Sequence, residues 1–332
     1  MKGRLERKMG IEKEIQSKIA DMPEYMTRFY YSIMTQTPLT KKRYITNVIR
    51  FLSIIGAGKP VTLKQLNGID AFAIQKYISD ISYFDRNGET RELSETTKAN
   101  IYSCLSAFFS FLASNNMIEN NPFADGAIKR PRPRETEVIF LTADEVKAVE
   151  KTIINGAGTS RMVSRQKNWK YRDFLLFWLP VVNGIRVGAL SEINVEDIDF
   201  KDRSIRVIEK GNKPMKIYFD DKADFYLRLW LSTRDEILAG QKSDALFISN
   251  HKTRISVRAI EVLIGKYTLA ATGRHISPHK LRATFATALY KKKRDIELVQ
   301  KALHHTSPVP TQRYVKVFDQ DIRDAVNSSL YD

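Results

Sequence analysis

The stretch 277–314 concentrates side chains that could bind a phosphoryl group and attack it. It opens with a Ser-Pro pair, which is typical of a helix start, where free N–H groups and the helix dipole favour an anion. His279 and Arg282 follow on one face of the expected helix. His305 adds a donor, and Tyr314 adds a phenol that could serve as a nucleophile. The pattern favours a phosphate held by cations beside an attacking phenol.

The order of these residues resembles that of the tyrosine recombinases, or phage-type integrases. The family pattern has His-x-x-Arg, here 279–282, and a Tyr nine residues after a His, here Tyr314 after His305. Upstream, Asn-Gly-Ile-Arg at 183–186 is close to the family's Thr-Gly-Leu-Arg. Between them, Glu-Lys-Gly-Asn-Lys at 209–213 stands where the family has a hairpin with Gly-Lys-Gly-Asn-Lys. One such motif arises by chance, whereas four in order are a specific signal.

The resemblance implies strand cleavage at a DNA phosphodiester without metal, ATP or another cofactor. The tyrosine would attack the scissile phosphate, form a 3′-phosphotyrosyl link and free a 5′ hydroxyl, which Lys210 would protonate. Arg186 and Arg282 would stabilise the charge that develops on the phosphate. His279 would help to move the proton of the tyrosine, and His305 would donate to the phosphate. The implied catalytic set is Arg186, Lys210, His279, Arg282, His305 and Tyr314.

The resemblance also implies a fold and partners. We expect a mainly α protein in an Xer-like arrangement, with a helical SAM-like core-binding domain and an α-rich catalytic domain. The catalytic domain should contain a small antiparallel three-stranded sheet. The partners would be double-stranded DNA recombination sites, held by a homotetramer that passes through a Holliday junction, together with accessory or directionality proteins.

The sequence departs from the family pattern at three positions. His304 stands where the family usually has Gly, so two adjacent histidines compete for one role, and the spacing to Tyr314 favours His305. Ala189 replaces an acidic residue that is common three positions after the first Arg, and Ala283 replaces a frequent His or Arg. Two other functions stay open: DNA relaxation like that of a type IB topoisomerase, and a catalytically silent DNA-binding regulator of the same fold.

Composition points to an anionic partner. The 332 residues carry 54 Lys and Arg against 38 Asp and Glu, a net charge of +16, which favours nucleic acid before a membrane. The single Cys104 excludes an internal disulfide and a Cys-based metal site, and the five histidines lack zinc spacing, so we expect no metal. The longest apolar run, 174–182, is well short of a membrane span, and no signal peptide is recognisable. We therefore expect a cytoplasmic protein with no membrane partner.

The first part of the chain reads as an N-terminal extension, 1–20, followed by a core-binding domain, 21–125, that is helical throughout. Thr40, Asp70 and Ser94 each precede an apolar helical stripe and are expected N-caps. Cations crowd two of these helix starts, where they could contact DNA or form a solvated face. They are Lys41, Lys42, Arg43 and Lys98.

A basic interdomain linker, 126–138, follows. Two prolines keep such a segment extended, and its cations suit a DNA backbone, although a plain solvated linker has the same composition. The predicted DNA contacts here are Lys129, Arg130, Arg132 and Arg134.

The catalytic domain, 139–332, opens with a capping box formed by Thr142 and Glu145. A basic loop is expected at 155–172, and its contact with DNA stays undecided. Three short strands are expected at 197–200, 204–209 and 213–219, with Lys210 near the tip of a hairpin that turns at Gly-Asn. The tail helix, 318–332, carries an apolar stripe that would pack on its own domain or on a neighbouring protomer.

Overall fold

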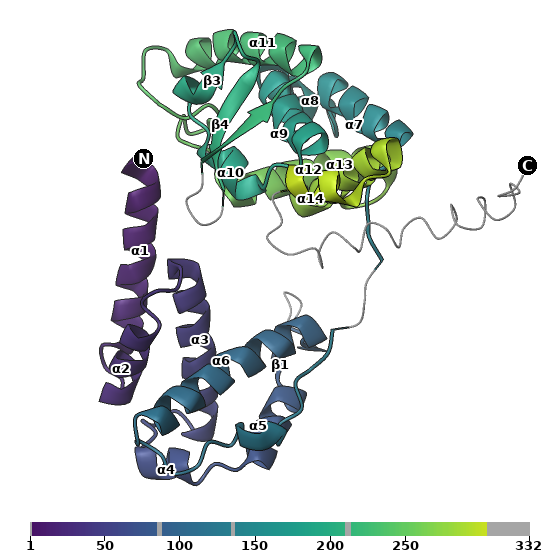
Figure 1. The fold of residues 1–332 in the computed structure, drawn as a ribbon. Coiled ribbons are helices and arrows are strands. Elements are labelled where there is room, and N and C mark those ends of the chain that lie inside the picture. Colours follow the sequence, from purple (N-terminus) through teal and green to yellow (C-terminus); the bar gives the residue numbers. More distant parts are fainter. Residues whose placement is uncertain (1, 85–87, 134–136, 210–213, 304–332) are drawn as a thin grey trace, which may run out of the picture. The chain divides into compact units, whose positions relative to one another are not determined.

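The computed structural model describes residues 2–84, 88–133, 137–209 and 214–303, with side chains from residue 8 onward (Figure 1). The chain divides into two compact units, residues 1–136 and 137–332. Each has its own hydrophobic core. No described helix is long and apolar enough to cross a membrane.

In the residues that the structure describes, the regular elements of the first unit are helices and one pair of antiparallel strands. Its core is built from interlocking aromatic side chains, among them Phe51, Phe108 and Phe109, whose rings meet edge to face. The elements are α1 (Lys2–Ile19), α2 (Glu24–Ser32), α3 (Pro38–Ile55), α4 (Leu63–Asn67), α5 (Ala71–Asp80), β1 (Ser82–Phe84), β2 (Thr90–Glu92), α6 (Glu95–Ser114) and a 3-10 turn, η1 (Ala124–Gly126).

The helix at the N-terminus belongs to the core of this unit. Ile15 is fully buried and Ile19 is nearly so, and α1 packs against α3. Ile15 and Ile19 therefore face the protein, whereas Met9 in the same helix is 51% exposed.

The structure confirms two of the predicted caps in this unit and corrects a third. Asp70 and Ser94 accept hydrogen bonds from the backbone N–H groups three residues on. Helix α3, however, begins earlier than expected and is capped by Thr37 in place of Thr40. The reason is Pro38, which fits the first helical position because it lacks an N–H and has a fixed φ.

The expectation of helix throughout 21–125 is wrong for one segment. Strands β1 and β2 pair antiparallel, with Ser82 opposite Glu92 and Phe84 opposite Thr90. The sequence between α5 and α6 has no helical apolar stripe, and it carries an Asn-Gly pair, which favours a hairpin turn.

The second unit is organised around the buried helix α9, which packs against α7, α11, α12 and α13 (Figure 1). The elements are α7 (Ala143–Asn155), α8 (Ser160–Gln166), η2 (Lys167–Trp169), α9 (Lys170–Asn183), α10 (Val187–Glu192), η3 (Val195–Asp197), β3 (Ile198–Asp199), β4 (Ser204–Ile208), β5 (Pro214–Tyr218), α11 (Asp221–Leu238), α12 (Val257–Thr272), α13 (Pro278–Lys293) and α14 (Ile296–Ala302).

The small sheet matches the predicted one. Its three strands lie in the order β3-β4-β5 and pair antiparallel, with Ile205 opposite Ile198 on one side and Ile217 on the other. Ile205 is fully buried and Ile217 nearly so, so one face of the sheet joins the core. The mainly α fold class with a small antiparallel sheet is confirmed.

The basic segment 155–172 is largely helical and not a loop. Thr159 caps α8 by accepting a hydrogen bond from the Met162 N–H. Arg172 turns inward, is nearly buried, and pairs with Asp173 at 2.7 Å. Its other side donates to the Ile248 carbonyl at 2.8 Å, so this cation holds the interior together and is not presented to a partner.

Candidate active site

A left-handed turn between two helices places Arg186. Helix α9 ends at Asn183, and Gly184 adopts a φ of 63° while its N–H donates to the Pro180 carbonyl at 2.9 Å. This is a common helix ending that favours glycine. Arg186 then occupies the N-cap position of α10, and its side chain is about one-third exposed. The sequence motif thus forms a tight corner that presents a guanidinium.

Arg282 fastens three segments together from the interior. It lies in the second turn of α13 and is 3% exposed. One terminal nitrogen donates to the Gly184 carbonyl and the other to the Leu303 carbonyl. Gly184 comes two residues before Arg186, and Leu303 comes two residues before His305. One buried guanidinium therefore joins the corner before Arg186, helix α13 and the end of α14.

His279 lies one turn before Arg282 on α13, at a helix start with Ser277 in the N-cap position. The expected side-chain cap of Ser277 is not formed, although its backbone is extended as in an N-cap. The residue is exposed to solvent. Loss of solvation, and then the positive charges of Arg282, Lys280 and Arg186, lower the pKa of His279 below its usual value. The neutral imidazole is thereby favoured near neutral pH.

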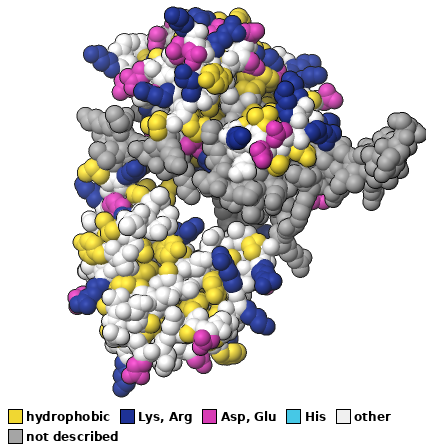
Figure 2. All heavy atoms as spheres, in the orientation of Figure 1, with side chains coloured by type: hydrophobic (Ala, Val, Ile, Leu, Met, Phe, Trp, Pro, Cys, Tyr) yellow, Lys and Arg dark blue, Asp and Glu magenta, His cyan; other side chains and the backbone are white. Residues whose placement is uncertain are grey.

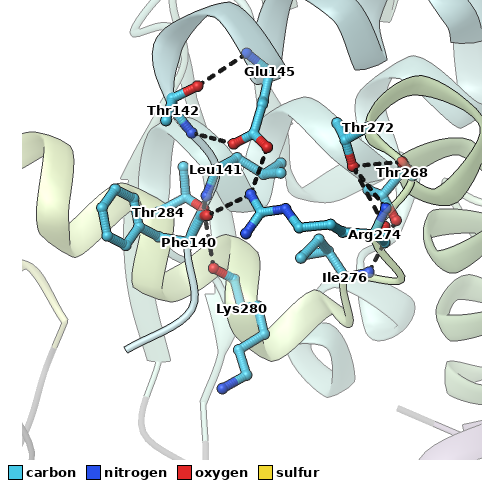
Figure 3. A network of polar contacts seen from close by, with 10 residues as sticks. All are labelled: Phe140, Leu141, Thr142, Glu145, Thr268, Thr272, Arg274, Ile276, Lys280 and Thr284. Carbon is cyan, nitrogen blue, oxygen red and sulfur yellow. Dashed lines mark hydrogen bonds and ion pairs between the residues drawn. The ribbon is translucent and has the colours of Figure 1, made fainter. Parts of the chain in front are cut away.

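A polar network anchors the first turns of α13 to the start of the second unit (Figure 3). The Leu141 N–H donates to the Thr284 hydroxyl at 2.9 Å, and that hydroxyl donates to the Lys280 carbonyl at 3.0 Å. Beside it, Arg274 pairs with the Glu145 carboxylate at 2.5 Å. These contacts fix the helix that carries His279 and Arg282. The predicted capping box at the start of α7 is confirmed within the same network.

A carboxylate that sequence reasoning missed completes the described site. The guanidinium of Arg186 pairs with the carboxylate of Glu209, and the Arg186 N–H approaches the same carboxylate at 3.5 Å. The Glu209 side chain is only 6% exposed. The signal was present in the sequence, because Glu209 stands where the resembled family has glycine before its lysine.

The described site therefore contains Arg186, His279 and Arg282, which come from two separate stretches of sequence, the start of α10 and the start of α13. The other predicted catalytic residues, Lys210, His305 and Tyr314, lie outside the described residues. The Gly-Asn turn, the predicted tail helix 318–332 and Arg134 of the linker also lie outside the described residues.

The structure places two of the predicted DNA contacts in the interior of the first unit. The Lys41 side chain is 4% exposed, and its ammonium pairs with Glu12 at 2.5 Å. Lys98 is also nearly buried and lies 3.7 Å from Glu95. A buried, paired ammonium is not available to a DNA phosphate, so the structure corrects the prediction for these two lysines.

Four other predicted contacts are exposed. Arg43 lies at the start of α3 and, like the three linker residues Lys129, Arg130 and Arg132, is open to solvent. We call these three residues the linker cations. Lys42 is partly exposed and pairs with Glu14 at 2.6 Å. In the face drawn in Figure 2, Lys and Arg side chains are spread over both units and interspersed with acidic ones.

Comparison with known proteins identifies the family. The model of the Phage integrase family matches residues 140–321, more than half of the chain. The chain belongs to the phage integrase family. It is accordingly a tyrosine recombinase, an enzyme of site-specific DNA recombination, and Arg186, His279 and Arg282 lie within the matched region.

Relatives and solved structures agree with this assignment. The recombinase is 28% identical to tyrosine recombinase XerC of Caldanaerobacter subterraneus subsp. tengcongensis over 92% of this chain and 86% of that protein. It is 34% identical to XerC of Thermodesulfovibrio yellowstonii over 68% of this chain and 72% of that one. Its fold is similar to that of XerH recombinase in a post-cleavage complex with difH, with a TM-score of 0.70 and 19% identity over 96% of this chain and 88% of that one. A lambda integrase dimer bound to a core site has a TM-score of 0.61 at 20% identity over 88% and 94% of the two chains.

Proposed function

We propose that this recombinase cuts and rejoins specific DNA sites through a covalent link to Tyr314. The phenol attacks the scissile phosphate, the 3′ phosphate stays on the protein, and the 5′ oxygen leaves as a hydroxyl protonated by Lys210. Religation reverses these steps on an exchanged strand. The phosphotyrosyl bond keeps the energy of the phosphodiester, so the reaction needs no ATP, and cations and proton donors stabilise the charge in place of a metal.

The arrangement around Arg282 is the observation that carries this proposal. Its buried guanidinium holds the corner that presents Arg186, the helix that carries His279, and the end of α14, which leads in sequence to His305. A cation set that gathers on one phosphate must be positioned before the substrate arrives, because catalysis by preorganised charge avoids rearrangement during reaction. The hydrogen bonds of Arg282 support a site that is assembled before a phosphodiester binds.

The lowered pKa of His279 supports its role in moving a proton. An imidazole that is neutral near neutral pH can accept the proton of a phenol that attacks. The same cations that lower this pKa would attract the phosphate. His279 is therefore proposed as the proton acceptor, and Arg186 as a phosphate ligand, because part of its side chain is open to solvent.

We also propose that the partners are two double-stranded DNA sites bound by a homotetramer, and that strand exchange proceeds through a Holliday junction. The solved XerH and lambda integrase structures contain those proteins bound to their own DNA sites. In this chain, Arg43 and the linker cations supply exposed positive charge for a DNA backbone. Residues 1–20, 21–125, 126–138 and 139–332 are proposed as the N-terminal segment, core-binding domain, linker and catalytic domain.

The test is covalent trapping on nicked suicide DNA drawn from the sequence that flanks the gene. The wild-type chain should give a protein–DNA band that survives SDS and forms in the presence of a chelator. Tyr314→Phe should bind the same DNA and give no such band. An adduct with the Phe variant would refute the assignment of Tyr314, and binding without any adduct from wild type would favour a silent regulator.

A second assay separates recombination from DNA relaxation. The recombinase should leave a supercoiled plasmid that lacks its site unchanged, whereas a type IB topoisomerase-like activity would relax it. Exchange between two plasmids that each carry the site should require wild-type Tyr314. Relaxation of the site-free plasmid at a similar rate would overturn the proposed site specificity.

A further inference from the structure

The pairing of Arg186 with Glu209 joins a cation at the N-cap position of α10 to the end of a strand. Residue 209 directly follows β4, whose last residue, Ile208, pairs with Pro214 of β5. The Glu209 carboxylate contacts Arg186 twice, through the guanidinium and through the backbone N–H. One side chain therefore fixes both the position of the α10 N-terminus and the direction of its arginine.

The exposures of the two partners show on which side the carboxylate lies. Glu209 is 6% exposed, while Arg186 is 35% exposed. The carboxylate thus lies on the inner side of the guanidinium, and a phosphate has to approach from the outer side. A guanidinium carries five N–H donors in a fixed fork, so pairing on one side leaves donors for an anion on the other.

Helix α10 does not supply this carboxylate itself. Position 189, three residues after Arg186, is a buried alanine, although the resembled family commonly has an acidic residue there. In this chain the negative charge next to the guanidinium comes from the hairpin, at the position just before Lys210.

We propose that Glu209 is a positioning residue for strand cleavage, which holds the Arg186 guanidinium in the orientation that binds the scissile phosphate and ties that guanidinium to the strand end leading to Lys210. This role rests on the proposed function of Arg186 as a phosphate ligand. The charge of Glu209 is needed because a charge-assisted hydrogen bond restrains a long side chain more strongly than a neutral one.

The opposite effect, a brake in which the carboxylate repels the phosphate, is disfavoured by burial. A brake has to lie between the guanidinium and the substrate, whereas Glu209 lies on the inner side. The two ideas predict opposite changes in rate when the charge is removed. Positioning predicts a slower cleavage step, and a brake predicts a faster one.

The experiment measures single-turnover adduct formation on the suicide substrate with Glu209→Gln, which keeps the shape and hydrogen-bonding capacity of the side chain and removes its charge. We expect the rate constant for cleavage to fall about 10-fold to 100-fold. The dissociation constant for DNA should stay within about 3-fold of wild type, since one phosphate contact among many is affected. The matched control is Glu196→Gln, which removes the same charge from an exposed position on the same unit and should cleave like wild type.

A double-mutant cycle with Arg186→Lys separates positioning from a general loss of structure. If Glu209 acts through Arg186, adding Glu209→Gln to Arg186→Lys should lower the rate by less than about 2-fold. An equal loss in both backgrounds, or a wild-type or faster rate for Glu209→Gln alone, would overturn the proposal. Rates are compared below the thermal transitions of all variants. Failure of wild type to form any adduct would instead overturn the proposed chemistry, and this role with it.

Discussion

Replacing Gly184 by alanine should destabilise the second unit, because the turn between α9 and α10 needs a left-handed residue in a crowded position. Gly184 has a φ of 63°, a left-handed conformation that favours glycine. A Cβ built there would lie 2.5 Å from Cδ1 of Phe285 and 3.0 Å from Cδ2 of Leu303. Leu303 is fully buried, so it cannot move aside into solvent.

The expected magnitude is the sum of three effects. The left-handed conformation costs a non-glycine residue about 1–2 kcal/mol. The overlap with Phe285 and Leu303 adds roughly 1–3 kcal/mol, as for other insertions into a packed core. The lower entropy of an unfolded chain with alanine returns about 0.4–1 kcal/mol. The net loss in the free energy of unfolding is therefore roughly 1–4.6 kcal/mol, or about 2–18 °C in Tm for a unit of this size.

Tryptophan fluorescence reports on this unit alone. The three tryptophans, Trp169, Trp178 and Trp230, all lie in residues 137–332, so their emission follows the unfolding of the second unit in the full chain. The control is Gly188→Ala in α10, where a Cβ meets nothing within 4 Å. The control should unfold at the same temperature as wild type or up to a few degrees higher. An unchanged or raised Tm for Gly184→Ala would refute the argument from the left-handed turn and the crowded contact.

Three further predictions follow from burial and charge. Changing the linker cations together to alanine should weaken DNA binding and lower the magnitude of the slope of log K against log salt by up to about 2.7, as measured by a binding titration in salt; an unchanged slope would exclude them as phosphate contacts. Lys41→Ala should lower the free energy of unfolding of the first unit by roughly 1–3 kcal/mol, because it removes the cation that pairs with Glu12, while DNA affinity changes little. The pKa of His279 is lowered in the folded chain, so the unfolded chain binds the proton more readily and stability falls as pH drops below about 6.5. His279→Gln should flatten this fall in Tm between about pH 7 and pH 5, and an unaltered pH profile would count against the lowered pKa.

Local rules account for the parts of the fold that the sequence predicted well. A cap such as Asp70 bonds to the backbone three residues away, and the strand at 204–208 shows its buried face through alternation within five residues. These signals need no knowledge of the rest of the chain. The missed hairpin β1–β2 and the shifted start of α3 also had local signals, in an Asn-Gly pair and in Pro38.

Side-chain exposure could not be predicted in the same way, because it depends on partners far along the chain. Lys41 and Arg43 are two residues apart near a helix start, and both read as cations on a basic face. The structure buries Lys41 against Glu12 and leaves Arg43 exposed. Glu12 lies in α1, and neither the charge nor the spacing of residues in the sequence predicts that α1 packs against α3. A charge run therefore indicates an anionic partner for the chain as a whole and does not say which of its lysines face that partner.

In the site as well, the sequence identified residues but did not reveal the contacts that hold them. Motifs identified Arg186 and Arg282, since their spacing to neighbouring residues is specific, but they did not reveal what holds either guanidinium. Arg282 is held by two carbonyls, 98 and 21 residues away, and Arg186 by a carboxylate 23 residues away. Every residue has a backbone carbonyl, so the two contacts that hold Arg282 cannot be recognised in the sequence. The contact that holds Arg186 can, because it depends on the carboxylate of Glu209, directly before Lys210. Recombinases that have an acidic residue in place of the family's glycine before this lysine can therefore be compared by that charge.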